Sequence, residues 1–355
     1  MRIALLLPAL LAHTPLLAAK LELVAGGGTS AAPCKAAELQ LKEPFGVEFT
    51  PRGEMIIVEM EHGQRVFRVS KEGAAQLIAG TGRRGNEGDG GDPRNAQFAG
   101  IHNLAITPDG TIYLADSFNQ RVRRIRADFS RLEAFAGTGS KGFGGDGGPA
   151  LQAVIGTPMQ VALDPRNEFL LIADLPAHRI RRVNLKTNLI ETVAGNGKAG
   201  VPVDGEPALE QPLADPRAVV ADRAGGLYIL ERNGNALRYV DAAGKIKTVA
   251  GTGKKGLSGD GGPALEASMN GPKHLCMDRD GTVLIADAEN HVIRRFDPKS
   301  GVITRVAGTG KAGAGGIGGD PLQCELRRPH GVTIGPDGLL YITDSYNDRI
   351  LRIVP

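Results

Sequence analysis

Short apolar stretches alternate with turn-forming residues along almost the whole chain. The segment 272–308 shows the pattern clearly: apolar and β-branched residues dominate 272–277, 282–287, 292–296 and 302–308, and Gly, Pro, Asp and Asn occupy the gaps. Runs of this length, bounded by turn residues, are typical of β-strands. The segment therefore predicts four short strands joined by tight turns.

This four-strand pattern recurs at a regular interval. A Val, Ile or Phe followed by Ala-Gly ends at positions 26, 80, 137, 195, 251 and 308, so neighbouring copies lie 54 to 58 residues apart. Four-stranded units repeated around an axis form a β-propeller, in which each unit is one blade and is stabilised by its neighbours. We predict an all-β fold, a six-bladed β-propeller of four-stranded antiparallel blades, as a single domain over residues 20–355.

The two ends of the chain are expected to share one blade. The last copy contains only three strand-like runs, and the stretch 21–26 supplies the missing fourth. Pairing of these segments would close the ring and would cover two strand edges that invite aggregation when they are open. We therefore predict that the N-terminal strand pairs in the last blade.

Three segments carry a recognisable repeat signature. The sequences at 116–122, 287–293 and 344–350 are DSFNQRV, DAENHVI and DSYNDRI. They resemble the NHL repeat, and the resemblance implies a six-bladed NHL-type propeller over the whole predicted domain. Because NHL propellers include binding scaffolds, extracytoplasmic sensor domains and a few enzymes, the resemblance implies a fold more directly than an activity.

Composition narrows the class of partner. The chain has 42 basic and 39 acidic residues, a net charge of +3, 4% aromatic residues and no Trp, while Gly supplies 50 of the 355 residues. This charge gives no field strong enough to attract nucleic acid, and few aromatic side chains are available to stack on bases. We expect a monomer without a nucleic-acid partner, whose partner is a protein or a small anionic ligand.

The first residues have the pattern of a targeting segment. Met1-Arg2 precede an apolar run over 3–12, and the segment ends with the small residues Ala18-Ala19. One positive charge, a short apolar run and a small-residue end are typical of a secretory signal peptide. The run is too short for a membrane span and is interrupted by Pro8. We predict a signal peptide over residues 1–19 and a periplasmic or secreted protein.

Export would permit a disulfide bond. Cys34 and Cys324 fall in corresponding loops between repeats, and Cys276 lies inside an apolar run. A bridge between Cys34 and Cys324 is therefore expected, with two free thiols as the alternative.

Acidic residues that recur in every repeat are expected to support the blades. An acid ends the second run of each copy, at Glu59, Asp116, Asp174, Glu231, Asp287 and Asp344. Such side chains accept backbone N–H groups in tight turns. We expect them also to pair with the arginines that begin the next run, which are Arg65, Arg121, Arg179 and Arg349.

The glycine-rich loops between repeats are expected to be ordered turns. Several match the letters of a dinucleotide-binding fingerprint, but that fingerprint requires a βαβ unit that an all-β chain lacks. Asp146 and Asp260 lie in two of these loops. One carboxylate per loop is too few for calcium, which takes six to eight oxygen ligands.

Positions that differ between otherwise similar repeats are the better functional candidates. The first residues of the innermost strands surround the mouth of the central channel, where the six repeats differ most. We predict a ligand-binding mouth formed by Phe45, His102, Asn103, Met159, Gln160, Arg217, Lys273, His274 and His330.

Two chemistries suit this mouth. Arg217, Lys273 and partly protonated His102 and His330 could capture a carboxylate or phosphate group. His102 and His330, with His274 as a less suitable third ligand, could instead hold one zinc or another divalent metal. A solvated rim that binds nothing is the third alternative.

The NHL resemblance adds detail to the metal alternative. NHL-type peptidylglycine-amidating lyases hold zinc with histidines at the starts of innermost strands in alternate blades. His102 and His330 match two of these positions in blades two and six. The third position, in blade four, is Arg217, and His274 lies in blade five and out of phase.

A calcium site like that of gluconolactonases would use a Glu, Asn and Asp set around the axis. Glu48 and Asn103 are available, but the set is incomplete. We therefore favour an extracytoplasmic binding scaffold that acts through its channel mouth over an enzyme. A metal-dependent lyase or hydrolase with its site at the same mouth is the alternative.

Overall fold

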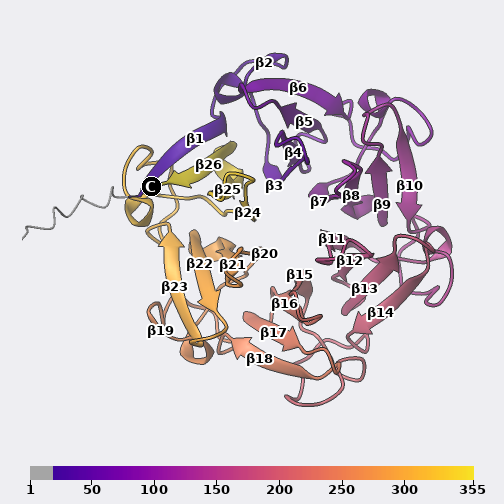
Figure 1. The fold of residues 1–355 in the computed structure, drawn as a ribbon, viewed down its shortest axis with the longest axis vertical. Coiled ribbons are helices and arrows are strands. Elements are labelled where there is room, and N and C mark those ends of the chain that lie inside the picture. Colours follow the sequence, from indigo (N-terminus) through magenta and orange to yellow (C-terminus); the bar gives the residue numbers. More distant parts are fainter. Residues whose placement is uncertain (1–18) are drawn as a thin grey trace, which may run out of the picture.

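Six antiparallel β-sheets surround a central axis in the computed structural model, which describes residues 19–355 (Figure 1). This confirms the predicted all-β, six-bladed propeller. The predicted signal peptide, apart from its last residue, lies outside the described residues. Within residues 19–355, no helix combines the length and the apolar character needed to cross a membrane.

Blades 1 to 5 each run from the axis outward in chain order. Blade 1 contains β3 (Pro44–Phe49), β4 (Met55–Glu59), β5 (Val66–Val69) and β6 (Ala74–Ala79). Blade 2 contains β7 (Ile101–Ile106), β8 (Ile112–Asp116), β9 (Arg121–Ile125) and β10 (Leu132–Ala136). Blade 3 contains β11 (Pro158–Leu163), β12 (Phe169–Asp174), β13 (Arg179–Asn184) and β14 (Ile190–Ala194).

The next two blades repeat this order. Blade 4 contains β15 (Pro216–Ala221), β16 (Leu227–Glu231), β17 (Ala236–Val240) and β18 (Ile246–Ala250). Blade 5 contains β20 (His274–Met277), β21 (Val283–Asp287), β22 (Val292–Asp297) and β23 (Val302–Ala307).

Blade 6 joins the two ends of the chain, as predicted. It consists of β24 (Gly331–Ile334), β25 (Leu340–Asp344), β26 (Arg349–Val354) and, on its outer edge, β1 (Lys20–Gly26). Strand β1 pairs antiparallel with β26, with Leu21 opposite Ile353 and Leu23 opposite Leu351. Strand β24 contacts β3 of blade 1, which closes the ring.

Two blades are wider than the predicted four strands. The short strands β2 (Cys34–Lys35) and β19 (Gly262–Pro263) pair with the outer strands β6 and β23. They belong to the glycine-rich loops, which run back along the outer edge of a blade and donate backbone hydrogen bonds to it. The remaining elements are one-turn 3-10 helices: η1 (Ala36–Glu38), η2 (Pro93–Asn95), η3 (Ser117–Asn119), η4 (Ala150–Gln152), η5 (Ala264–Glu266), η6 (Ala288–Asn290), η7 (Pro321–Gln323) and η8 (Ser345–Asn347).

The hydrophobic core lies between the blades. Six clusters of buried apolar side chains occur, one at each interface between neighbouring blades. Between blades 2 and 3, for example, Tyr113 and Phe135 pack with Ile172. Each blade thus buries its apolar faces only against its neighbours, so a closed ring has no unpartnered face.

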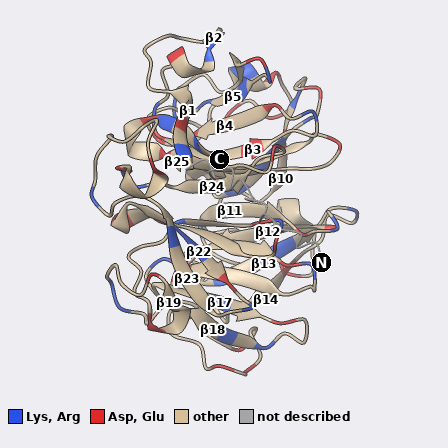
Figure 2. Ribbon diagram, turned by 60° about the vertical axis from the view of Figure 1, so that its left-hand side comes forward, with Lys and Arg blue, Asp and Glu red and all other residues tan. Residues whose placement is uncertain are grey.

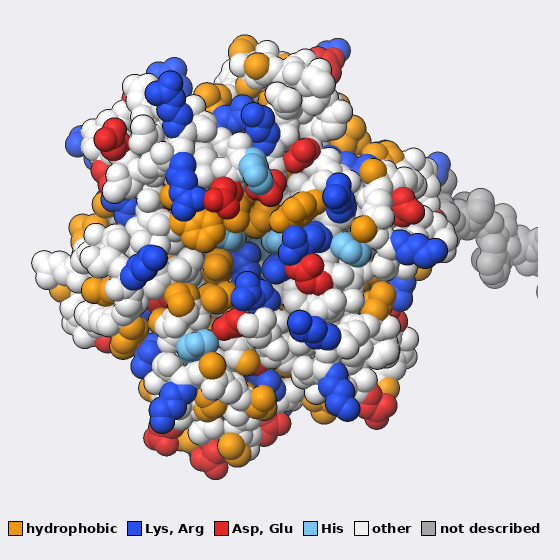
Figure 3. Space-filling view, turned by 180° about the vertical axis from the view of Figure 1, so that it is seen from behind, with side chains coloured by type: hydrophobic (Ala, Val, Ile, Leu, Met, Phe, Trp, Pro, Cys, Tyr) orange, Lys and Arg blue, Asp and Glu red, His pale blue; other side chains and the backbone are white. Residues whose placement is uncertain are grey.

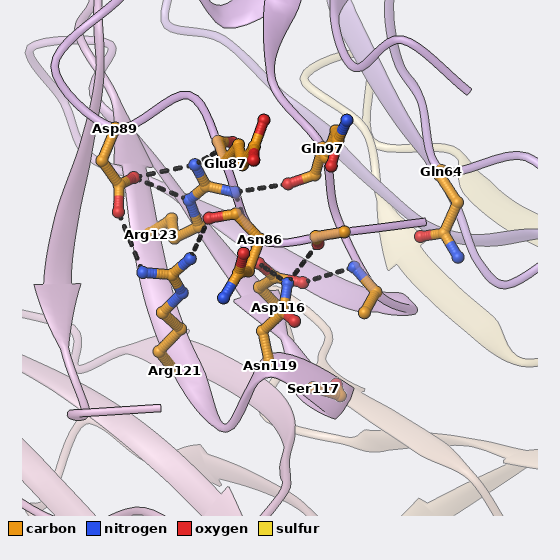
Figure 4. Close-up of polar contacts among 12 residues, drawn as sticks. Gln64, Asn86, Glu87, Asp89, Gln97, Asp116, Ser117, Asn119, Arg121 and Arg123 are labelled. Carbon is orange, nitrogen blue, oxygen red and sulfur yellow. Dashed lines mark hydrogen bonds and ion pairs between the residues drawn. The ribbon is translucent and has the colours of Figure 1, made fainter. Parts of the chain in front are cut away.

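Buried arginines fasten the glycine-rich loops to the blades. In blade 2 the side chain of Arg123 is fully buried, and it binds the Asp89 carboxylate at 2.8 Å and the carbonyl oxygens of Glu87 and Gln97 (Figure 4). Arg121 binds the other oxygen of Asp89 at 2.9 Å. These contacts hold the loop that precedes the blade against its outer face.

Asp146 and Asp260, which lie in two other glycine-rich loops, have the same role as Asp89. Asp146 pairs with Arg181, and Asp260 pairs with Arg294 and Arg305. Both carboxylates therefore anchor loops, which supports the expectation that these loops are ordered turns. In these ion pairs the acid lies in a loop and the arginine in a strand, and charged residues of both signs are distributed around the whole molecule (Figure 2).

The expected pairing of each strand-ending acid with the next arginine is only partly correct. Glu59 binds Arg65 and Asp344 binds Arg349, as predicted. In blades 2, 4 and 5 the acid meets an arginine two residues further along, in the pairs Asp116–Arg123, Glu231–Arg238 and Asp287–Arg294. Residues i and i+2 of a strand share one face, so an arginine at either position can reach the acid.

The expected disulfide is wrong. Cys34, Cys276 and Cys324 all have free thiols. Cys34 lies on the extra strand β2 beside blade 1, whereas Cys324 is buried in the cluster between blades 5 and 6. Their similar places in the repeat put them over different blades.

Candidate functional site at the channel mouth

Irregular strand starts direct two consecutive side chains of a blade toward the axis. In β3, β7, β11 and β15 the pairing with the next strand shifts within the first residues. A bulge of this kind adds one residue and re-aims its side chain. In blade 2, for example, both His102 and Asn103 therefore face the axis, whereas a regular strand would alternate.

The chain enters most innermost strands through a left-handed residue. Two positions before the first mouth residue, φ is positive at Glu43, Gly100, Asp215, Gly271 and Arg328. This conformation is unusual for residues other than Gly and marks a sharp turn. The turn presents a backbone carbonyl group to the side chain that follows it.

Two histidines use these carbonyl groups. His102 Nδ1 lies 3.2 Å from the Gly100 carbonyl oxygen and 2.8 Å from Ser117 Oγ, and Ser117 in turn donates to the Pro158 carbonyl. His330 Nδ1 lies 2.7 Å from the Arg328 carbonyl oxygen. Carbonyl oxygens only accept, so both rings carry their proton on Nδ1 and keep an unprotonated Nε2.

Both imidazoles are neutral. Burial, followed by the charge of Arg217, lowers the pKa of His102 and of His330 well below the ordinary 6.5. The expectation of partly protonated histidines is therefore wrong, because desolvation and a neighbouring cation both disfavour the imidazolium form.

Aromatic rings line one side of the mouth. Phe45 stacks on His330 with ring centres 4.0 Å apart and meets His102 edge-on at 5.4 Å. Phe118 and Tyr346 extend this row at its two ends, next to His102 and His330 respectively. We call these five residues the aromatic arc; it is built by blades 6, 1 and 2.

A cationic group occupies the opposite side. Arg217 of blade 4 is 5% exposed, and among residues 19–355 no carboxylate or other acceptor is bonded to its guanidinium. Burial, with Arg232 nearby, lowers the pKa of Arg217 to about 9, so the group is still a cation at neutral pH. Arg232 itself is paired with Asp215 at 3.2 Å.

The second cation of the mouth is already paired. Lys273 lies 3.2 Å from Glu289, which also binds Arg328. Burial and Arg217 lower the pKa of Lys273 to about 8. Positive charge therefore exceeds negative charge around the axis, and Lys, Arg and His side chains gather around the central depression of this face (Figure 3).

A polar layer closes the channel beneath the mouth. His274 of blade 5 reaches across the axis, and its Nε2 accepts from the amide groups of Asn103 at 3.0 Å and Gln160 at 3.2 Å. The backbone N–H groups of Val161 and Val219 donate to the amide oxygens, which fixes the orientation of both amides. We call Asn103, Gln160 and His274 the His274 layer.

The His274 layer removes three predicted residues from the ligand-facing group. Burial and Arg217 lower the pKa of His274 to about 3, so it stays neutral and serves as an acceptor inside the protein. Its Nε2 is occupied, which makes it unsuitable as the third metal ligand. Met159 is half-buried.

The residues present fit a metal ion poorly. His102 and His330 are oriented as metal-binding histidines are, with Nδ1–H bonded to an acceptor. Within the described part of the chain, however, no three His, Cys, Asp or Glu residues are arranged to hold a metal ion. Arg217 also acts on both imidazoles with a positive charge that would repel a cation.

Several mouth residues were not predicted from the sequence, among them Phe118, Tyr346, Ser117 and Arg232. Phe118, Tyr346 and Ser117 belong to the Asp-x-x-Asn turns, and Arg232 follows the equivalent acid of blade 4. A signal was available, because these turns lie on the same face as the strand starts. The variable residues within them could have been compared from repeat to repeat.

The NHL repeat family matches the chain at residues 326–353. The chain is 27% identical over 288 residues to the protein Suppressor of Quenching 1 from Arabidopsis thaliana, a match that covers 78% of this chain and 27% of that protein. It is 26% identical over 325 residues to NHL repeat-containing protein 2 from Bos taurus, with 83% and 44% covered. The chain thus spans less than half the length of these relatives.

Solved structures share the fold at low sequence identity. An auxiliary nutrient binding protein from Bacteroides thetaiotaomicron superposes with a TM-score of 0.67 at 14% identity, over 95% of this chain and 76% of the other. Virginiamycin B lyase from Staphylococcus aureus superposes with a TM-score of 0.54 at 15% identity, over 95% and 99%. Binding proteins and enzymes are therefore both built on this fold.

Proposed function

We propose that this chain, an NHL-repeat β-propeller with six blades, binds a small anionic ligand at its channel mouth through Arg217. The observation that carries the proposal is an arginine that is 5% exposed and whose guanidinium has no counter-ion among the described residues. Removing a charge from water without a partner costs several kcal/mol, and a bound anion would offset that cost. The planar guanidinium suits a carboxylate or a phosphate, which it can hold with two parallel hydrogen bonds.

The rest of the mouth narrows the class of ligand. The unprotonated Nε2 atoms of His102 and His330 can accept hydrogen bonds from a hydroxyl or amine group of the ligand. The aromatic arc offers apolar contact on the side opposite Arg217. A small carboxylate or phosphate ester with an apolar or unsaturated body and one donor group fits this combination.

A binding role accounts for the mouth better than catalysis does. The carboxylates of this group are already paired: Glu289 is held by Lys273 and Arg328, and Asp215 by Arg232. Among residues 19–355, neither histidine has a carboxylate partner that would raise its basicity. Within this part of the chain the mouth therefore lacks the matched acid and base that general acid–base catalysis requires. If the predicted signal peptide is functional, the ligand is met outside the cytoplasm.

Removal of the Arg217 charge tests the proposal. Calorimetric titration at low ionic strength would compare sodium phosphate, acetate and benzoate as probes for the wild type and for Arg217→Met. Charge-assisted hydrogen bonds contribute about 1.5–3 kcal/mol, so we expect Arg217→Met to weaken binding about ten-fold or more. Arg223→Met, which removes an exposed arginine elsewhere, should bind as the wild type does.

The same titration can contradict the proposal. Equal affinity of Arg217→Met and the wild type would show that Arg217 is not the anion site. Absence of binding for all three probes would also overturn it. Benzamide is a neutral analogue of benzoate. Equal affinity for the two would show that the negative charge of the ligand does not contribute to binding.

Metal content distinguishes the second candidate, a metal-dependent lyase or hydrolase. This candidate is favoured only by the orientation of His102 and His330, whose Nε2 atoms are free. Mass spectrometry of the purified protein, without a histidine tag, should find less than one tenth of a metal ion per chain. One zinc, copper or iron per chain, lost in the His102→Ala/His330→Ala variant, would instead establish the metal site.

A further inference from the structure

The lower half of the channel contains a cavity that the mouth does not use. It has a volume of about 330 Å³ and lies between His274, at its upper end, and the turn residues Asp164, Pro165 and Asn167 at the opposite face. The His274 layer separates it from Arg217 and the histidines of the mouth. The two ends of the channel are therefore distinct compartments.

Small side chains leave this part of the channel hollow. Two positions after the His274 layer, the innermost strands point inward again, and the residues at this level are Glu48, Ala105, Ala162, Val220, Cys276 and Thr333. Five of them line the cavity, and Thr333 touches Glu48. The remaining wall is about equally polar and apolar, and its apolar residues include Leu104, Ile106, Leu163, Leu275 and Met277.

Glu48 is the one carboxyl group of the cavity that has no fixed role. The other, Asp164, accepts backbone N–H groups from Arg166, Glu168 and Phe169 and shapes its own turn. Glu48 accepts from Thr333 Oγ1 at 3.3 Å, a long contact. No Lys or Arg is among the residues that line the cavity.

The titratable groups that face Glu48 carry no charge that could pair with its carboxylate. His274 above it is neutral, because burial lowers the pKa of its imidazole to about 3. Burial also raises the pKa of the Cys276 thiol well above its ordinary value, so Cys276 is neutral as well. Without a cation nearby, burial raises the pKa of Glu48 to about 7.

We propose that this lower cavity is a second binding site, which takes a small primary amine in its ammonium form with an apolar body. The ammonium group would pair with the Glu48 carboxylate, and the apolar body would lie against Leu104, Ile106 and Leu275. A half-buried carboxyl without a bound cation, in a wall of mixed polar and apolar surface, fits this ligand class, because the ammonium group can pair with the carboxylate while the body covers the apolar part of the wall. The proposal is independent of anion binding at the mouth.

Titration with pentylamine, with pentan-1-ol as its neutral match, tests the second site. The aliphatic ammonium stays protonated up to about pH 10. Only the ionised carboxylate pairs with it, so a group with a pKa of about 7 predicts that affinity rises about ten-fold between pH 6 and pH 8. Pentan-1-ol should bind more weakly and without this pH dependence.

Two variants separate the carboxyl from the cavity. Glu48→Gln keeps the shape of the side chain and its contact with Thr333, and it should lose about ten-fold or more in affinity for pentylamine together with the pH dependence. Ala162→Ile reduces the volume of the cavity while the carboxyl is kept, and it should weaken both probes. Glu168→Gln, an exposed position beside the same turn, is the matched control and should bind as the wild type does.

Several results would overturn the second site. These are equal binding of pentylamine and pentan-1-ol, full affinity in Glu48→Gln, or absence of pentylamine binding to the wild type at millimolar concentration. Thermal unfolding of each variant shows whether it is folded. If Glu48→Gln does not fold, Ala162→Ile and the pH dependence of the wild type decide the question.

Discussion

Arginines that are equally buried have different roles in this protein. Arg123, Arg181 and Arg294 are 0% exposed, and each holds a loop carboxylate and two backbone carbonyl groups. Arg217 is almost as buried but has no partner among residues 19–355. The first group satisfies its hydrogen-bonding capacity within the protein, whereas Arg217 keeps this capacity for something that binds. Partners, rather than burial, distinguish the structural arginines from the candidate ligand-binding one.

Neighbouring arginines in β22 allow the structural role to be measured. Arg294→Met leaves the buried Asp287 and the loop acid Asp260 without this guanidinium and strands two carbonyl groups. We expect the free energy of unfolding to fall by about 3–5 kcal/mol. Arg295→Met removes a side chain that is 32% exposed, and we expect a loss below about 1 kcal/mol. Chemical denaturation of both variants provides the comparison.

The loss of unfolding free energy in Arg294→Met should depend on pH. Burial already raises the pKa of Asp287 from 3.8 to about 6, and removal of the Arg294 charge would raise it further. A folded-state pKa above the unfolded value favours the folded state as the carboxyl takes up its proton. The deficit should therefore be largest at high pH, should shrink as the pH falls toward 6, and should change little below about pH 6. A deficit that is the same at pH 5 and pH 8 would contradict this account.

At the scale of single elements, the innermost strands position the mouth and β1 closes the ring. The shifted pairing at the start of β7 brings His102 and Asn103 to the axis together, where one joins the aromatic arc and the other the His274 layer. Strand β1 contributes Leu21 to the core between blades 5 and 6. Without β1, the outer edge of β26 would be open.

Deletion of residues 1–26 tests the closure. This change removes β1, exposes β26 and leaves the sites of Leu21 and Ala25 unfilled. Burial of one Leu side chain contributes about 1.5–3 kcal/mol, so we expect a loss of about 4 kcal/mol or more, together with association through the open edge. Thermal unfolding and size-exclusion chromatography measure the two effects.

A matched chain makes the deletion interpretable. Deletion of residues 1–18 alone leaves β1 intact and should unfold at the temperature of the full-length protein. A synthetic peptide with residues 19–28 should restore part of the stability when it is added to the chain that lacks 1–26. Equal unfolding temperatures for the two deletions would refute the closure.

At the scale of the whole molecule, the channel has two ends of opposite character. The mouth presents Arg217 and an aromatic arc built by blades 6, 1 and 2, while the lower cavity presents the Glu48 carboxyl in a wall of mixed polar and apolar surface. The His274 layer lies between them and links side chains of blades 2, 3 and 5. A six-bladed ring with non-identical copies can therefore carry two different sites on one axis.

The sequence alone determined the fold. Six blades follow from the spacing of the Ala-Gly segments and from the four apolar runs in each copy. The additional strand at 21–26 indicates how the ring closes. These features can be recognised in the sequence because strand length and turn chemistry are local properties of the chain. It also identified the positions around the axis, since each copy could be aligned with the others. His102, Arg217 and His330 were found in this way.

Only the tertiary structure decided what these positions do. Asn103 and His274 are 171 residues apart and meet across the axis, so no local pattern could show that they close the channel. The neutrality of His102 and His330, the missing partner of Arg217 and the isolation of Glu48 depend on which groups surround each side chain. The prediction of a disulfide between Cys34 and Cys324 was wrong for the same reason. The two residues have similar places in their repeats, but these places lie over different blades of the ring. Contacts between distant copies are set by the packing of the whole ring, and they separate the residues that maintain the fold from those left free to bind.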